Sequence, residues 1–288
     1  RSFVVALSIM MVTGVWRRSA SGEAKVAEAK VADAAHQSVE EQAVAEIEQL
    51  GGKFKVDQKM PGKPVVSVSL SFTEVSDAGL VHVNGLTRLE TLALQKTQVS
   101  DAGLVHLKGL TRLHTLDLRD TTVSDAGLVH LKDLTRLQDL YLEQTQVTGT
   151  GLVHLKGLTR LKSLDLDGNT LFTDAGMEHV KGFTELEELY LWRTQVTDAG
   201  LAHLKGLSKL RILDFDGMPI TGTGLAHLKA MTELETLHIA GTQLTDARLV
   251  HLKDFTKLQK LVFFSTQVTN TGLEHLSGLT NLQTLVIF

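Results

Sequence analysis

The chain has 288 residues, of which 43% are hydrophobic and 22% charged, with a formal net charge of -4 at pH 7. This length and apolar content are enough for a sizeable buried core. The acidic balance and the lack of a long basic run exclude a typical nucleic-acid partner, because phosphate binding needs clustered Lys and Arg. The chain has no cysteine, which excludes disulfides, thiolate metal sites and a cysteine nucleophile.

The chain begins with an apolar run, Phe3 to Trp16, within the length of a signal-peptide core and short for a membrane-spanning helix. Arg17 and Arg18 follow it, and then come small residues. We predict a signal peptide or membrane anchor over residues 1–22; the alternative is a soluble segment with a misplaced start. The prediction implies an exported or cell-envelope protein, whether periplasmic, membrane-anchored or secreted.

Residues 23–50 are rich in Ala, Glu and Lys, a composition typical of helices and semi-rigid spacers. We interpret them as a helix and stalk, with a partner-binding coiled coil as the alternative. The spacing of Val44, Ile47 and Leu50 would let these side chains lie on the first repeat.

Residues 51–65 are predicted to form an N-terminal cap over the first repeat. Gly51 and Gly52 are expected to end the preceding helix, and Phe54 to Asp57 to form an edge strand.

Over residues 66–288 one sequence unit recurs every 24 residues, apart from one step of 25. The stretch Leu89 to Arg112, reading LETLALQKTQVSDAGLVHLKGLTR, is a representative copy. A fixed period of this length indicates a solenoid whose units bury their apolar sides against one another. We predict nine full repeats and a truncated tenth, forming an α/β solenoid with a concave parallel sheet and short convex helices.

Within this copy, Leu92 and Leu94 alternate with polar residues, which predicts a short strand with its leucines inward. The Thr97 hydroxyl is expected to pair with backbone groups of the neighbouring turn. Ser100 is expected to cap the helix, and Asp101 to place negative charge at the positive end of the helix.

The helical part of the unit carries three further expectations. Leu107 and its neighbours at helical spacing complete the apolar seam. Gly103 is expected to let the helix approach the strand layer closely. A left-handed helix stop is expected at Gly109 and its equivalents Gly85, Gly157, Gly182, Gly206 and Gly278.

The copies LVHLKGLTRLHTLDLRDTTVSDAGL and LAHLKGLSKL resemble the leucine-rich repeats of bacterial exported or membrane-associated proteins, built on LxxLxLxxTxVTDAGLxHLxGLT. They are also similar to the cysteine-containing repeats of F-box adaptors, although Thr97 and its equivalents stand where that class has cysteine. The N-terminal segment is too short and simple for an F-box, so no ubiquitin-adaptor role carries over. The resemblance implies a scaffold that recognises proteins, glycans or other ligands.

Histidine occupies one equivalent place in each repeat: His82, His106, His130, His154, His179, His203, His227, His251 and His275. A metal-binding array is one interpretation. Neighbouring helices lie about 8 to 10 Å apart, however, which is too far for shared ligands at about 2 Å. We favour a structural role in which each ring pairs with an adjacent turn.

The outward strand positions are not dictated by the repeat, and we predict that they bind the ligand: Asp117, Tyr141, Glu143, Asp165, Asp167, Glu188, Tyr190, Trp192, Asp214, Asp216 and His238. Both tyrosines of the chain and one of its two tryptophans fall in this set. Tyr and Trp are rigid amphipathic anchors, and clustered acids favour a basic partner. The alternative is a solvated face with chance aromatics.

Other functions for these residues are less favoured. Asp165, Asp167, Asp214 and Asp216 are candidate calcium ligands, but a sheet lacks the usual looped geometry. Asp214 and His238 are a candidate acid–base dyad without an obvious nucleophile. Stacking of a sugar on Tyr190 and Trp192 is the second choice. We therefore expect a non-catalytic protein or peptide scaffold without cofactor or metal, and a glycan-binding module as the alternative.

Two repeats are irregular. One carries an inserted residue between Asn169 and Thr173, and another has the turn Gly217-Met218-Pro219, which lacks the usual Thr hydroxyl. They mark either a bulge beside the binding surface or tolerated loop drift.

Overall fold

The computed structural model describes residues 39–263 and 267–287, so residues 1–22 and most of the expected stalk lie outside the described residues. The repeats lie within one compact unit, Glu40–Phe288. None of the described helices combines the length and the apolar character needed to span a bilayer.

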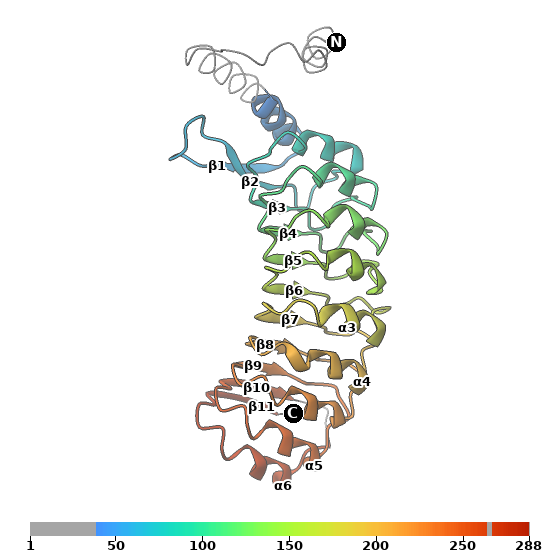
Figure 1. Cartoon of the computed structure of the whole chain (residues 1–288), viewed down its shortest axis with the longest axis vertical. Coiled ribbons are helices and arrows are strands. Elements are labelled where there is room, and N and C mark those ends of the chain that lie inside the picture. The colour runs from blue at the N-terminus through green and yellow to red at the C-terminus, as the bar shows by residue number, and fades with distance from the viewer. Residues whose placement is uncertain (1–38, 264–266, 288) are drawn as a thin grey trace, which may run out of the picture. The chain divides into compact units, whose positions relative to one another are not determined.

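Within the described residues, eleven strands form one sheet in chain order (Figure 1). They are β1 (Lys53–Val56), β2 (Val65–Ser69), β3 (Thr91–Ala93), β4 (Thr115–Asp117), β5 (Asp139–Tyr141), β6 (Ser163–Asp165), β7 (Glu188–Tyr190), β8 (Ile212–Asp214), β9 (Thr236–His238), β10 (Lys260–Phe263) and β11 (Thr284–Ile287). β1 pairs with β2 antiparallel, and every later pair is parallel. Each strand residue lies opposite its equivalent in the next repeat, as Leu92 lies opposite Leu116. The predicted parallel sheet is confirmed.

Short helices lie along the other side of the sheet (Figure 1). Most are short 3-10 segments, from three to seven residues in length. The 3-10 segments are η1 (Asp77–Val83), η2 (Gly103–Leu107), η3 (Gly127–Leu131), η4 (Thr150–Leu155), η5 (Ala202–Gly206), η6 (Thr223–Leu228), η7 (Val250–Leu252) and η8 (Glu274–Leu276). The α-helical segments are α3 (Asp174–Val180), α4 (Asp198–Leu201), α5 (Asp246–Leu249) and α6 (Asn270–Leu273).

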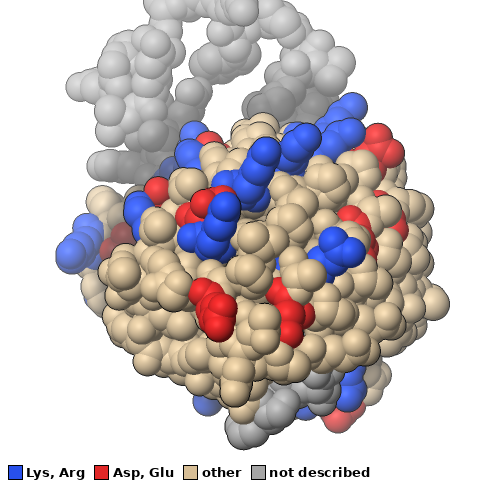
Figure 2. Space-filling model, turned by 90° about the horizontal axis from the view of Figure 1, so that it is seen from below, with Lys and Arg blue, Asp and Glu red and all other residues tan. Residues whose placement is uncertain are grey.

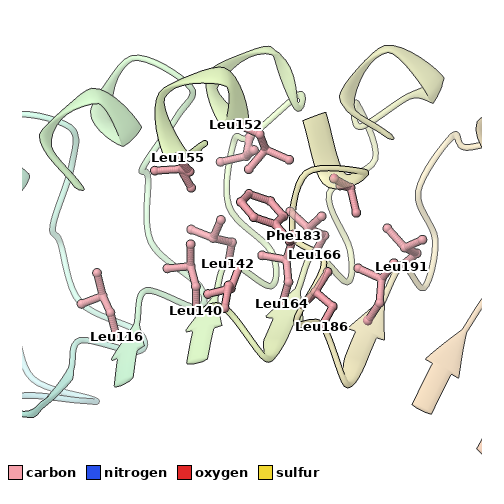
Figure 3. Packing of buried hydrophobic residues seen from close by; sticks show 14 of the residues in the cluster. Leu116, Leu140, Leu142, Leu152, Leu155, Leu164, Leu166, Phe183, Leu186 and Leu191 are labelled. Carbon is pink, nitrogen blue, oxygen red and sulfur yellow. The ribbon is translucent and has the colours of Figure 1, made fainter. Parts of the chain in front are cut away.

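The core lies between the sheet and these helices. Strand leucines such as Leu140 and Leu164 face helix leucines such as Leu155, and all three are fully buried (Figure 3). Leu107, assigned to the seam from its spacing, is also fully buried. Since one repeat cannot cover its own apolar side, each coil depends on its neighbours for this burial.

An additional α-helix at 39–49 precedes β1. Ile47 is fully buried in the core, and Val44 and Leu50 pack against it partly buried, as their spacing predicts. Antiparallel strand β1 lies beside β2, at the position expected for the edge strand of a cap. At the other end of the sheet, Leu285 and Ile287 of β11 are each 41% exposed.

An aspartate at the start of most helical segments links one coil to the next, a contact that the sequence reasoning did not predict. The Asp101 carboxylate accepts hydrogen bonds from the Ser124 backbone N–H (2.7 Å) and hydroxyl (2.6 Å). We call the series the Asp ladder: Asp77 to Ser100, Asp101 to Ser124, Asp125 to Thr148, Asp174 to Thr197, Asp198 to Thr221 and Asp246 to Thr269.

The same ladder explains the glycine at Gly103. A Cβ atom there would come within 2.4 Å of Asp77 Oδ1 and 3.2 Å of Asp77 Cα. The glycine therefore makes room for the preceding coil. The prediction that it lets the helix approach the strand layer named the wrong neighbour. The Ser100 hydroxyl donates to Asp77 (2.6 Å), and it also accepts a long hydrogen bond from the Ala102 N–H (3.4 Å), the contact expected of a helix cap.

Two turn predictions were also wrong. The Thr97 hydroxyl donates to the Leu94 carbonyl of its own turn (2.7 Å), so it closes a local turn and does not reach the neighbouring one. Gly109 and its equivalents have no left-handed backbone, because the chain leaves the helical segment through right-handed turns such as Leu110 N–H to Leu107 O (2.9 Å). The left-handed residue instead follows the strand, as at Lys96 (φ 53°).

The repeat histidines lie on the helix side, as expected, but their role differs. Most are half-exposed, and His154 and His275 are exposed. The expected hydrogen bonds to adjacent turns are not found, and within residues 39–263 and 267–287 the rings assemble no metal-binding group. These histidines are surface residues because their place on the helix flank faces solvent.

The inserted residue produces a local bulge. Leu171 is 68% exposed, whereas Phe172 is fully buried against Gly149 and Gly176. Asn169 takes the place of the usual Thr and donates to the carbonyls of Leu142 (2.8 Å) and Leu166 (2.9 Å), which joins two coils.

Candidate functional site

The candidate residues lie on the sheet, in two rows that run across the strands. We define the first row by direct strand register: Asp117, Tyr141, Asp165, Tyr190, Asp214 and His238, from β4 to β9. The second row follows two residues later in each coil: Arg119, Glu143, Asp167, Trp192, Asp216 and Ala240. Adjacent strands lie about 4.8 Å apart, so in the first row acids alternate with aromatic rings at that spacing over β4 to β8.

The aromatic rings are half-buried on this face, with cations beside two of them. Arg119 lies over the Tyr141 ring (5.3 Å to the centroid), and Arg193 lies over Trp192 (4.4 Å). The Tyr190 hydroxyl donates to Glu188 (3.3 Å). The rings are thus held in place while part of each remains open to solvent, as a rigid binding anchor requires.

Most acids of the two rows also have a structural task. The Oδ1 atoms of Asp117, Asp165 and Asp214 accept the backbone N–H two residues later (3.1, 3.0 and 2.8 Å). Asp167 Oδ1 accepts the Trp192 N–H of the next coil (2.7 Å). These bonds satisfy backbone donors where the strands end, and they leave the second carboxyl oxygen of each acid for another partner.

Charge on this face is weaker than the sequence indicates. Burial and the nearby Asp165 raise the pKa of Asp167 to about 8, despite the hydrogen bond from Trp192. Burial raises the pKa of Asp165 to about 6. The Asp167 carboxyl is therefore largely protonated at neutral pH, so the preference for a basic partner is smaller than the number of acids implies.

Arg119 neutralises the acid at the β4 end of the first row. Its Nε and Nη2 atoms contact the two Asp117 oxygens at 3.0 and 2.7 Å, and its side chain extends toward Glu143 (4.0 Å). At the other end, His238 Nδ1 lies 3.1 Å from Asp214 Oδ2 and 3.9 Å from Asp216 Oδ2. The adjacency of Asp214 and His238, expected from the repeat, is confirmed.

The structure brings all eleven predicted residues onto one face but adds three that the sequence reasoning missed. Arg119 and Arg193 lie against the aromatic rings, and buried Ser163 donates to Glu188 (3.0 Å). Arg119 occupies an outward position that could have been selected from the alternation alone. Arg193 and Ser163 carry no sequence signal beyond their strand neighbours.

A cavity of about 450 Å³ is lined by Gln138, Thr159, Arg160, Lys162, Thr184 and Glu185. None of these residues belongs to either row. Viewed from the β11 end, basic and acidic side chains are interspersed among uncharged ones, and neither sign covers the visible face (Figure 2).

Comparisons with known proteins give the fold a name. A family model described as Leucine Rich repeat matches residues 158–179. An internalin C2 from Listeria monocytogenes has a TM-score of 0.61 at 24% identity, covering 85% of this chain and 92% of that chain. The chain has the leucine-rich-repeat fold.

Other leucine-rich-repeat structures are similar at this level. A leucine-rich-repeat protein of Leptospira interrogans has a TM-score of 0.59 at 20% identity, with 72% of this chain and 57% of that chain covered. The ectodomain of the Arabidopsis receptor kinase HAESA, in complex with an IDA peptide hormone, has a TM-score of 0.67 at 19% identity. The superposition covers 87% of this chain and 44% of that one. No curated protein matches this leucine-rich-repeat chain significantly.

Proposed function

We propose that this leucine-rich-repeat protein recognises a protein or peptide on its sheet face and catalyses no reaction. The observation that carries the proposal is the first row, in which Tyr141 and Tyr190 alternate with Asp165 and Asp214 across four adjacent strands. Fixed aromatic rings beside carboxyl oxygens provide both apolar anchoring and hydrogen-bond acceptors for a polypeptide. The peptide hormone bound by the HAESA ectodomain supports the same use of the fold.

A catalytic use of the Asp214 and His238 pair is disfavoured by its surroundings. His238 Nε2 is buried and has no hydrogen-bond partner within the described residues, so no hydroxyl group is placed to be activated by it as a nucleophile. A triad needs the base to contact both an orienting acid and a nucleophile. Only the first of these contacts is present.

We place the protein outside the cytoplasm or at the cell envelope, on the basis of the apolar segment within residues 1–22. That segment would serve as a signal peptide or membrane anchor. A structural neighbour, the ectodomain of the Arabidopsis membrane receptor kinase GASSHO1/SCHENGEN3, supports such a location. The sheet face would then meet partners of the envelope or its surroundings, and nucleic acid would not be among them.

The test is selection from a random-peptide display library on the purified protein, followed by affinity measurement with one enriched synthetic peptide. Replacing both Tyr190 and Trp192 with Ala should weaken binding by at least about 30-fold, the effect of losing an interface hot spot of about 2 kcal/mol. Phe72→Ala is the matched control, since Phe72 is an aromatic residue, 67% exposed, outside both rows. The thermal unfolding midpoint should change little in either variant.

Equal peptide binding by the double variant and the control would contradict the proposal. A glycan array run with the same three proteins tests the second candidate, a glycan-binding module. Binding to a glycan that is lost in the double variant, without any peptide enrichment, would replace peptide recognition by sugar stacking on Tyr190 and Trp192.

A further inference from the structure

Three side chains converge where β8 and β9 lie side by side. Asp214 and Asp216 point to the same face because they are two residues apart on an extended segment, and His238 lies directly opposite Asp214. One ligand atom from each, His238 Nδ1 and an oxygen of each aspartate, all lie within 4.8 Å of one another. Within the described residues this is the one such group of three.

The spacing fits a common coordination sphere. His238 Nδ1 is 3.1 Å from Asp214 Oδ2 and 3.9 Å from Asp216 Oδ2. A metal ion bound at about 2.0 to 2.2 Å places neighbouring ligand atoms about 3 to 3.5 Å apart. Small side-chain rotations are therefore enough to bring all three atoms to bonding distance.

Both carboxylates are already oriented by the backbone. Asp214 Oδ1 accepts the Asp216 N–H (2.8 Å), and Asp216 Oδ1 accepts the Ala240 N–H (2.5 Å). Their Oδ2 atoms are left facing the imidazole. Such supporting hydrogen bonds to the non-coordinating atom are what hold metal ligands in place.

The two acids also lack the counterion that the other end of the row has. Asp117 is neutralised by a two-pronged pair with Arg119, whereas within the described residues no Lys or Arg forms an ion pair with Asp214 or Asp216. A divalent cation would balance both carboxylates.

We propose that Asp214, Asp216 and His238 bind a divalent first-row transition-metal ion, with Zn²⁺ as the representative. One imidazole with two carboxylates suits this class, whereas Ca²⁺ takes six to eight oxygen ligands and Mg²⁺ prefers oxygen and water. The three residues leave further coordination positions on the open sheet face to water or to a ligand. This site does not depend on peptide recognition by Tyr190 and Trp192.

The test is isothermal titration of the tag-free, chelator-treated full chain with ZnCl₂ at neutral pH, together with metal analysis after dialysis. One equivalent of Zn²⁺ should bind, and His238→Ala and Asp216→Asn should each weaken that binding at least about ten-fold. His227→Ala removes a half-buried helix histidine of the β8 coil, and Asp165→Asn removes a row carboxyl two strands away. Both controls should bind as the unchanged protein does.

Thermal unfolding gives a second measurement that does not require titration. Zn²⁺ should raise the unfolding midpoint of the unchanged protein and of both controls, and should not raise that of Asp216→Asn. Asp216→Asn keeps the side-chain shape and an oxygen acceptor, so its fold should persist. No bound Zn²⁺, equal weakening in His227→Ala or Asp165→Asn, or displacement of Zn²⁺ by an equal concentration of Ca²⁺ would each overturn the proposal.

Discussion

Replacing Gly151 with Ala tests how tightly adjacent coils pack on the helix side. An added Cβ atom would lie 2.6 Å from both the Cα and the carbonyl oxygen of Asp125 in the preceding coil. Non-bonded carbon atoms normally stand about 3.5 to 4.0 Å apart, so the two coils would have to separate locally by about 1 Å. These obstacles are backbone atoms, which cannot swing aside as a side-chain end does.

The expected loss of unfolding free energy is about 2 to 4 kcal/mol. Overpacking costs about 1 to 3 kcal/mol, and weakening of the hydrogen bond from Gly151 N–H to Asp125 (2.9 Å) adds about 1 kcal/mol. Gly206→Ala is the matched control: no atom lies within 4 Å of its added Cβ, and its φ is not left-handed. That variant should be stabilised by about 0.4 to 1 kcal/mol through reduced freedom of the unfolded chain.

Urea unfolding followed by circular dichroism measures both variants against the unchanged protein. The midpoint should fall for Gly151→Ala and stay equal or rise for Gly206→Ala, with similar slopes. If Gly151→Ala were as stable as Gly206→Ala, the close approach of the Asp125 backbone would not exist in solution.

Three further predictions concern the core, the turns and the sheet face. Leu107→Ala should cost about 2 to 5 kcal/mol in urea unfolding, since it leaves a cavity in a fully buried seam; a near-neutral result would place Leu107 outside the core. Asn169→Ala should cost about 1 to 3 kcal/mol by the same measurement, because the carbonyls of Leu142 and Leu166 each lose the hydrogen bond from the side-chain amide, and an unchanged midpoint would contradict this bridge. For Asp167 the folded pKa of about 8 lies above the unfolded value of about 3.9, so the folded state holds a proton that the unfolded state releases. Stability should therefore fall as pH rises from about 4 to 8. The urea midpoint of Asp167→Asn should fall less over this range than that of the unchanged protein. If the midpoints of the two proteins changed equally with pH, the assigned pKa would be refuted.

The strand layer could be predicted from the sequence because its cause is periodic. Leucines alternating at Leu92 and Leu94 fix which side of each strand is buried, and the constant spacing fixes the parallel register. The outward positions follow by the same alternation, which is why the predicted site residues share one face. The N-terminal segment within 1–22 and the ligand itself stay predictions.

The hydrogen bonds that join adjacent coils could not be predicted. The local sequence allows the same side chain to pair with its own helix start or with the next coil. Asp101 next to Ser100 is typical of a helix start, yet its carboxylate binds Ser124 in the following coil. Lys96 and Arg193 adopt a left-handed backbone that neither residue type favours, because the sharp turn after the strand requires it. Packing between coils determines both the partner of Asp101 and the left-handed backbone after the strand. The pattern within a single repeat carries no information about that packing.

The Asp ladder is interrupted twice, where Gly149 and Gly222 stand in place of aspartate with left-handed backbones. In a linear array, stability is a sum over neighbouring units and their shared boundaries, so these two junctions are where opening should begin or pause. Hydrogen exchange would then divide the array into three blocks that protect their amides separately. The second junction separates the coils of β8 and β9, and the convergence of Asp214 with His238 spans it from the opposite side. A cation bound by residues of both coils would stabilise this junction. Metal occupancy would then determine whether the blocks on its two sides unfold separately or together.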